Sequence, residues 1–268
     1  MAAIAFGMIG GGVMGEALLS RLIEQQVYAP SSVMVSDPMP ERRQYLEAQY
    51  GIQVTDNNLE AATASEVLFL AIKPQVFGTV ATQLKGEGST KALVLSILAG
   101  TTLEQLEAGF PDRPVVRVMP NTPAAVGAGV SALSGGKLAT VEHLAQARKI
   151  LGTVGQVVEV PEHLMDAVTG LSGSGPGYVA IVIEALADGG VLSGLPRGVA
   201  MELAIQTVLG TATLIREKGM HPGQLKDLVT SPGGTTIAGV AKLESLGLRT
   251  ALIEAVKAAT DRSMELGK

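Results

Sequence analysis

The sequence predicts an α/β protein, with an N-terminal doubly wound parallel sheet followed by an all-helical domain. Up to residue 161, short apolar β-rich runs alternate with amphipathic helical stretches, a pattern typical of parallel strands covered by helices on both faces. From residue 162 the strand signals stop, and apolar residues recur at helical spacing. We therefore expect two domains, at residues 1–161 and 162–268.

The expected strands of the first domain are short apolar runs bounded by turn residues. They are residues 3–10, 32–37, 66–72, 92–98, 114–120, 130–136 and 155–161. Amphipathic helices are expected between them, among others at residues 15–26, 40–50 and 103–109.

The second domain is expected to contain six helical segments, several of them apolar nearly all round. They are residues 162–171, 176–195, 196–219, 221–230, 235–247 and 248–267. A helix without a polar face is normally buried, and about a hundred residues can hardly bury so much apolar surface alone. We interpret this half as a dimerisation domain, with a compact monomeric bundle as the alternative.

Composition excludes several classes of protein. A formal net charge of −5 argues against a nucleic-acid surface, which needs clustered basic residues. The absence of cysteine excludes disulfides and thiolate metal sites and fits a cytoplasmic location. No uninterrupted apolar run reaches the roughly 18 residues of a membrane span, and no cluster has metal-ligand spacing, so we expect neither a membrane segment nor a metal.

A glycine-rich turn directly follows the first expected strand. Its spacing, G-x-G-x-x-G, suits a dinucleotide: the first glycine allows a tight turn, the second lets a pyrophosphate approach, and the third lets the helix pack closely. We expect all six residues of this turn to bind the cofactor: Gly10, Gly11, Gly12, Val13, Met14 and Gly15.

The end of the second expected strand is where a ribose-binding residue should lie. Asp37 favours a free 2′-hydroxyl, whereas Ser36, Arg42 and Arg43 suit a 2′-phosphate. Both arginines fit solvated charges on a surface helix equally well. These residues therefore leave the choice between NADH and NADPH open.

Other candidate residues lie where strands end or helices begin. Ala99 and Lys73 follow expected strands at the crevice edge, although Lys73 before Pro74 also fits a simple strand end. Asn121 stands in a proline-rich loop and Ser174 in a glycine-rich turn, and each of these segments also has a purely structural interpretation.

A second glycine-rich turn, SPGGTT at residues 231–236, opens onto a helix, and the N-terminus of a helix is suited to an anion. We expect its residues Ser231, Gly233, Gly234, Thr235 and Thr236 to contact the substrate. His221, before Pro222 at another helix start, is expected to be structural.

Five motifs together resemble the pyrroline-5-carboxylate reductase family, and they cover essentially the whole chain. They are GGGVMG, LAIKP, MPNTP, GLSGSGPGYV and LKDLVTSPGGTTIAGVAKLE, in family order. The resemblance implies a Rossmann-like domain and a helical dimerisation domain. It also implies NADPH as cofactor (with NADH as the alternative), homodimers that share a cleft, larger rings such as a decamer, and reduction of 1-pyrroline-5-carboxylate to L-proline.

The resemblance assigns further residues to each ligand. The counterparts of Ser36, Asn58 and the Ala71–Ile72–Lys73–Pro74 turn lie along the cofactor, and those of Asn121, Thr235 and Thr236 lie near the substrate. Some relatives have a hydroxyl residue in place of Asp37, and this departure weakens the assignment of NADPH over NADH.

Two other functions fit part of the pattern. A β-hydroxyacid dehydrogenase shares the first glycine turn but needs a lysine base on the long helix, and residues 176–195 contain neither Lys nor His. A regulatory nucleotide-binding protein would not need SPGGTT. A protonated imine is already electrophilic, so we expect catalysis mainly by positioning, with Thr236 contacting the ring nitrogen.

Overall fold

The computed structural model describes residues 3–86 and 91–267. The chain divides into two compact units, Met1–Gly173 with Ala259–Lys268, and Ser174–Ala258. The last turns of the C-terminal helix therefore belong to the first unit. The functional domain boundary after residue 161 stays a prediction.

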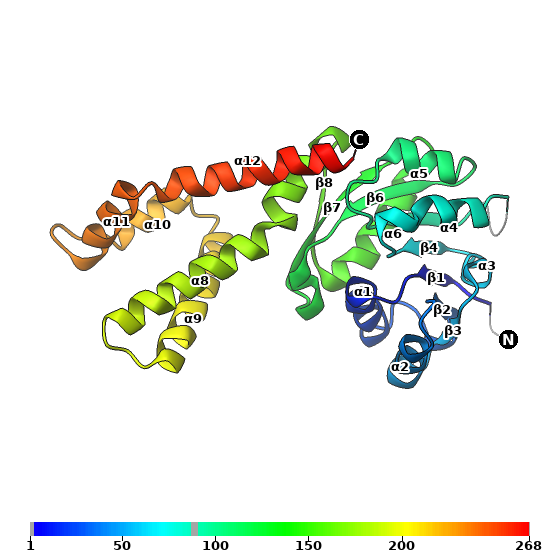
Figure 1. The fold of residues 1–268 in the computed structure, drawn as a ribbon, viewed down its shortest axis with the longest axis horizontal. Helices are drawn as coiled ribbons and strands as arrows, with labels where there is room; N and C mark the ends of the chain where they lie inside the picture. Colours follow the sequence, from blue (N-terminus) through cyan, green and yellow to red (C-terminus); the bar gives the residue numbers. More distant parts are fainter. Residues whose placement is uncertain (1–2, 87–90, 268) are drawn as a thin grey trace. The chain divides into compact units, whose positions relative to one another are not determined.

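The first unit is built on a sheet of eight strands within the described residues, in the order β3-β2-β1-β4-β5-β6-β7-β8 (Figure 1). Neighbouring strands from β3 to β6 are parallel, β7 is antiparallel to β6, and β8 is parallel to β7. The strands are β1 (Phe6–Ile9), β2 (Val33–Ser36), β3 (Gln53–Thr55), β4 (Val67–Leu70), β5 (Leu93–Ser96), β6 (Val115–Met119), β7 (Gly129–Gly135) and β8 (Gly155–Glu159).

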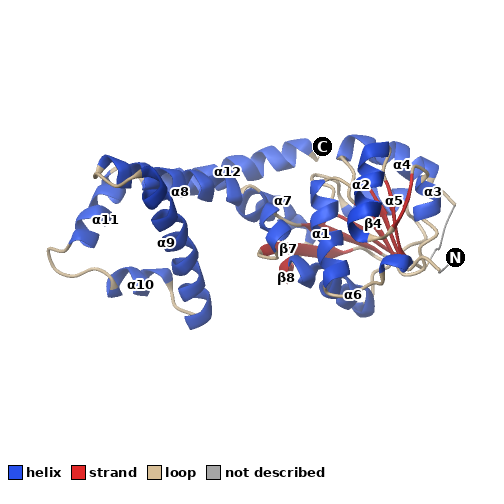
Figure 2. Ribbon diagram, turned by 90° about the horizontal axis from the view of Figure 1, so that it is seen from below, coloured by secondary structure: helices blue, strands red, loops and turns tan. Residues whose placement is uncertain are grey.

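Helices cover both faces of this sheet (Figure 2). They are α1 (Val13–Glu24), α2 (Pro40–Tyr50), α3 (Asn58–Ala61), α4 (Phe77–Gln83), α5 (Leu103–Gly109) and α6 (Val141–Leu151). A short helix, α7 (Met165–Val168), follows β8. Because side chains alternate along a strand, the central strands feed two cores. Phe69 joins the core with α1, α2 and α6, whereas Leu68 and Leu70 join the core with α3, α4 and α5.

Two features of the sheet differ from the sequence prediction. The sheet is not wholly parallel, because only residues 120–128 connect β6 to β7, and a parallel crossover needs a dozen residues or more. β3 was not predicted, because this three-residue edge strand is too short and polar to form an apolar run. The α/β fold class itself is confirmed.

The second unit is helical throughout its regular structure. Its helices are α8 (Gly175–Leu192), α9 (Arg197–Lys218), α10 (Pro222–Leu228), α11 (Thr235–Ser245) and the first part of α12 (Leu248–Leu266). α8 and α9 pack closely through the small residues Ala187, Ala200 and Ala204. Large apolar side chains elsewhere on these helices are exposed, including Ile181, which is 66% exposed, and Leu192, which is 91% exposed.

By length and composition, residues 162–192 and 197–218 could each cross a membrane. The sequence prediction asked for an uninterrupted apolar run, and these helices pass a test of mean hydropathy that tolerates a few charged residues. Such helices are weak evidence for a membrane, since an apolar helix that packs against another subunit has the same composition.

Candidate active site

The first glycine turn lies at the point where the sheet order reverses, between β1 and β4. From this point the chain runs outward to β2 and β3 on one side and to β5 and β6 on the other. Gly10 has a φ of +95°, and a Cβ at this position would lie 2.6 Å from the Ala71 carbonyl oxygen. The turn therefore needs glycine at its first position, and it lies where doubly wound sheets bind ligands.

Gly12 and Gly15 have different surroundings. A Cβ at Gly12 would have no atom within 4 Å, so this position is open on the protein side. A Cβ at Gly15 would lie 2.7 Å from the Gly10 carbonyl oxygen, so α1 packs against the turn only because this residue has no side chain. The three glycines thus fit the roles of tight turn, open approach and close packing that the spacing predicts.

The Asp37 carboxylate lies beside the glycine turn and is buried. Its Oδ2 accepts a hydrogen bond of 2.9 Å from the Gly11 N–H, and its Oδ1 accepts one of 2.9 Å from the Met39 N–H. Asp37 therefore ties the end of β2 to the turn after β1. The role of Asp37 toward a ribose stays a prediction.

Ser36 and Asn58 are adjacent at the same edge of the sheet. The Ser36 hydroxyl donates to Asn58 Oδ1 at 2.7 Å, and Asn58 Nδ2 donates to Gln83 Oε1 at 2.9 Å. The structure thus brings together two residues that the sequence assigned to the cofactor from segments 22 positions apart. Gln83 was not predicted, since no sequence motif marks it.

The predicted residues after β4 and β5 are accessible at the strand ends. Ala71 and Ile72 are half-buried, while Lys73, Pro74 and Ala99 are exposed. Ala71 lies directly against Gly10, because its N–H donates to the carbonyl of Ile9 at 2.9 Å. Ala71 therefore adjoins the glycine turn, whereas Pro74 and Ala99 line a separate pocket.

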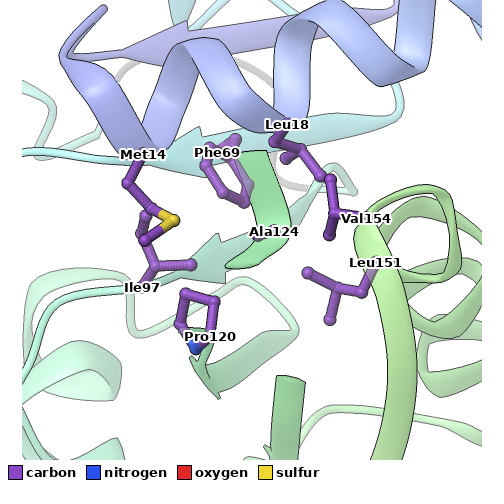
Figure 3. A pocket seen from close by; sticks show the side chains of 8 residues that line it. All are labelled: Met14, Leu18, Phe69, Ile97, Pro120, Ala124, Leu151 and Val154. Carbon is purple, nitrogen blue, oxygen red and sulfur yellow. The ribbon is translucent and has the colours of Figure 1, made fainter. Parts of the chain in front are cut away.

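Met14 differs from the other residues of the turn. Its side chain faces an apolar pocket, together with residues from β4, the loop after β5 and the loop after β6 (Figure 3). The residues that line this pocket are Met14, Leu18, Phe69, Ile97, Pro120, Ala124, Leu151 and Val154. Met14 therefore supports the crevice through apolar contacts.

Asn121 follows β6 and uses both ends of its side-chain amide within the protein. Its Oδ1 accepts from the Val130 N–H at 2.9 Å, and its Nδ2 donates to the Ser172 carbonyl at 3.2 Å. Ser172 lies in a π-helical turn, Thr169–Gly173, just before the division between the units. Asn121 thus links the loop after β6 to this turn, and contact with substrate stays a prediction.

The SPGGTT turn lies in the second unit. Gly233 has a φ of +68°, and the Gly234 N–H donates to the Ser231 carbonyl at 3.0 Å, which closes the turn. α11 begins at Thr235 with Gly234 as its N-cap, and both threonines are exposed. The first N–H groups of α11 have no acceptor within the helix, as an anion site at a helix N-terminus requires.

The other predicted residues of this unit lie at helix starts. Ser174 is the N-cap of α8, but its side chain makes no capping hydrogen bond. His221 caps α10, because its Nδ1 accepts from the Gly223 N–H at 3.1 Å, so its expected structural role is confirmed. Residues 3–86 and 91–267 contain no group of three or more His, Cys, Asp or Glu side chains that could hold a metal ion.

A polar network beside the first glycine turn was not predicted as a unit. Glu16, in the first turn of α1, accepts hydrogen bonds from Arg42, Tyr45 and Tyr50 of α2. Burial by itself would raise the pKa of Glu16, but the hydrogen bonds from Arg42, Tyr50 and Tyr45 outweigh burial and lower it. Burial and the Glu16 carboxylate raise the pKa of Tyr50.

Two family models match the chain. The model for pyrroline-5-carboxylate reductase dimerisation matches residues 162–266, and the model for NADP oxidoreductase, coenzyme F420-dependent, matches residues 5–100. The chain is 59% identical to the pyrroline-5-carboxylate reductase of Synechocystis sp., over 99% of each chain.

Solved structures agree with these matches. A pyrroline-5-carboxylate reductase from Coxiella burnetii superposes with a TM-score of 0.92 at 33% identity, and one from Plasmodium falciparum with NADP bound has a TM-score of 0.86 at 29% identity. Both comparisons cover 100% of each chain.

The sheet and its glycine turn define the class as a dinucleotide-dependent oxidoreductase with a Rossmann-like domain. Within this class, the chain belongs to the pyrroline-5-carboxylate reductase family, whose NAD(P)H-dependent reaction reduces the C=N bond of 1-pyrroline-5-carboxylate to L-proline. The matches also assign the apolar helical part of the chain to a dimerisation domain. The predicted family, fold class and reaction are thus confirmed.

Proposed function

We propose that this chain reduces its cyclic imine by positioning and exclusion of water, without a general base that removes a proton from the reacting carbon or nitrogen. The observation that carries this proposal is the SPGGTT turn. Here the first N–H groups of α11, which have no acceptor within the helix, lie next to two exposed threonine hydroxyls. An anionic carboxylate and a ring nitrogen are the two polar groups of the substrate, and this turn offers a donor or acceptor for each.

The first glycine turn fits the pyrophosphate of NADPH. Gly12 leaves space for close approach, and the early N–H groups of α1 point out of the helix. We assign Gly10 to Gly15, Ser36, Asp37, Asn58, Ala99 and the Ala71–Pro74 turn to this cofactor. When bound, the nicotinamide supplies the hydride.

The substrate carboxylate would accept hydrogen bonds from the backbone N–H of Thr235 and its neighbours at the start of α11. Ser231, Gly233 and Gly234 would shape the turn, because the Gly234 N–H already donates to the Ser231 carbonyl. Charge at a helix N-terminus is stabilised by the aligned peptide dipoles. The Thr236 hydroxyl would hold the ring nitrogen, while Asn121 and Ser174 would border the substrate.

The electronic requirement of the reaction explains why no base is needed. A cyclic imine binds as the protonated iminium, so its carbon is electrophilic before it meets the enzyme. Reduction then neutralises that charge and yields the amine. The protein contributes orientation, which can lower a barrier by several kcal/mol (about 7 or more in favourable cases).

Substitution of Thr236 tests this assignment. With saturating NADPH, Thr236→Val removes the hydroxyl at nearly constant shape, and we expect kcat to fall about tenfold or more, as for loss of a hydrogen bond to a charged group. Thr236→Ser keeps the hydroxyl and should retain most of the activity. If Thr236→Val turns over as fast as the unaltered enzyme, the threonine has no such role.

We further propose a homodimer in which the cleft is shared between subunits, assembled into a larger ring such as a decamer, in the cytoplasm. The exposed apolar side chains of the second unit support the association, because large apolar patches on single subunits are normally covered by a partner. Absence of cysteine and membership in a biosynthetic family support the compartment.

Co-expression of two variants with strongly reduced activity tests the shared cleft. One variant carries a bulky substitution at Gly12 in the cofactor turn, and the other carries Thr236→Val. If each site combines the cofactor turn of one subunit with the SPGGTT turn of its partner, mixed dimers contain one intact site, and about a quarter of the activity should return. If each cleft belongs to one subunit, mixing restores nothing.

A further inference from the structure

We infer that Arg42 is a positioning residue that orients the peptide between Gly11 and Gly12 for the cofactor pyrophosphate, and that it is not a ligand of the 2′-phosphate. This inference rests on the proposed cofactor site. It assigns a function to an arginine for which the sequence left two interpretations, a 2′-phosphate ligand and a solvated surface charge.

The Gly11 residue is held at both ends by side chains from distant segments. Its N–H donates to Asp37 Oδ2 at 2.9 Å, and its carbonyl oxygen accepts from Arg42 Nε at 2.5 Å. These partners lie 26 and 31 positions further along the chain. A glycine in a loop would otherwise sample many backbone conformations, so these two hydrogen bonds restrict it.

The orientation of the next N–H follows from the geometry of the peptide bond. The described residues contain no cis peptide bond, and in a trans peptide the carbonyl oxygen and the following N–H point in opposite directions. Because Arg42 holds the Gly11 oxygen on the α2 side, the Gly12 N–H points away from α2. No acceptor in the described part of the chain receives this N–H, and Gly12 is exposed.

Arg42 is itself held firmly in this position. A second nitrogen of its guanidinium group donates to Glu16 Oε2, and its guanidinium carbon lies 5.1 Å from the centre of the Tyr45 ring. Tyr45 and Tyr50 donate to the other Glu16 oxygen at 3.0 and 2.8 Å. Both side chains of the ion pair are largely shielded, with 26% of Arg42 and 22% of Glu16 exposed.

The pair also balances charge near the pyrophosphate position. A carboxylate in the first turn of α1 would repel an anion bound at the same helix N-terminus. Arg42 neutralises Glu16, so the turn can accept the anion without this repulsion. Two of the guanidinium nitrogens, Nε and Nη2, are engaged by the Gly11 carbonyl and Glu16, and these contacts direct the group toward the glycine turn.

Cofactor binding separates positioning from direct phosphate contact. We propose to measure dissociation constants of NADPH, NADH and ADP-ribose for the full-length protein and for Arg42→Gln, by fluorescence and calorimetry. We expect all three ligands to bind about tenfold more weakly, since each contains the pyrophosphate and each loses a well-oriented hydrogen bond to a charged group. The ratio of the NADPH and NADH constants should not change.

Two controls complete the experiment. Arg43→Gln removes the neighbouring arginine, which donates to the carbonyls of Asp37 and Pro38 and does not contact Gly11, so it should weaken ADP-ribose binding much less. Arg42→Lys keeps a positive charge and should bind all three ligands with intermediate affinity. Thermal unfolding of each variant identifies any that fails to fold, and Arg42→Lys then provides the comparison.

The outcomes are distinct. Selective loss of NADPH affinity in Arg42→Gln, with NADH and ADP-ribose unchanged, would overturn the inference, because it would make Arg42 a 2′-phosphate ligand. Unchanged affinity for all three ligands would overturn it as well. If the unaltered protein itself binds none of them, the proposed cofactor site has failed, and that result does not depend on Arg42.

Discussion

Two alanine substitutions in the first glycine turn should lower different properties: one should lower NADPH affinity and the other the stability of the fold. At Gly12 the backbone has φ −67° and ψ −176°, which any residue adopts, and a Cβ would have no atom within 4 Å. Gly12→Ala should therefore change the free energy of unfolding by less than about 0.5 kcal/mol. Its methyl group would occupy the approach to the pyrophosphate, and we expect NADPH affinity to fall at least about tenfold, or roughly 1.4 kcal/mol.

Gly10→Ala should mainly lower stability. Its φ of +95° is strained for alanine, and the new Cβ would lie 2.6 Å from the Ala71 carbonyl oxygen, a backbone atom at the end of β4. Strain of this kind costs about 1–3 kcal/mol, and the clash brings the total to roughly 2–4 kcal/mol. At about 2–4 °C per kcal/mol for a unit of this size, Tm should fall by roughly 4–16 °C.

The assay is thermal unfolding of both variants without cofactor, followed by titration with NADPH. Gly12→Ala should unfold at nearly the same temperature as the unaltered protein and bind poorly. Wild-type affinity in Gly12→Ala would refute the assignment of this turn to the pyrophosphate. Undiminished stability in Gly10→Ala would refute the steric argument for glycine at the first position.

Two further predictions concern polar contacts. Because the pKa of Glu16 is lowered in the folded protein from 4.5, its contribution to stability is complete above about pH 4.5 and declines as the pH falls below that value. The difference in Tm between Glu16→Gln and the unaltered protein should therefore be larger at pH 7 than at pH 3.5, and an equal difference at both would contradict this. Asn121→Ala should destabilise the protein by about 1–3 kcal/mol in denaturant unfolding, since it removes the hydrogen bonds to the Val130 N–H and the Ser172 carbonyl. Amide exchange in residues 169–173 should become faster, whereas Thr122→Ala, at an exposed neighbour, should change neither measurement.

The local elements of the fold were largely predictable. The apolar strands β1, β4, β5 and β6 and the glycine turn before α1 follow from short-range patterns, because each depends on residues adjacent in the chain. β3 escaped prediction because an edge strand needs few apolar residues. The direction of β7 escaped because it depends on the length of the connection between strands and not on the strand's own residues.

In the candidate site too, features that depend on adjacent residues were predictable, and contacts between distant segments were not. Sequence motifs identified Gly10, Gly12 and the SPGGTT turn, since each motif is contiguous in the chain and since Gly10 and Gly233 have a positive φ. No motif shows that Asp37 binds the Gly11 N–H, or that Asn121 reaches Ser172, because these partners lie 26 and 51 positions apart. Such contacts follow from the packing of the sheet and its helices.

The sequence by itself determined the class of sheet, the place of both glycine turns and the reaction family. Those features depend on hydrophobic period, on the backbone freedom of glycine and on motifs that are contiguous in the chain. Only the tertiary structure decided which side chains surround the first turn, because α1 and α2 become neighbours only when both cover the same face of the sheet. The role of Arg42 illustrates this, since its charge is visible in the sequence but its partners, Gly11 and Glu16, are not.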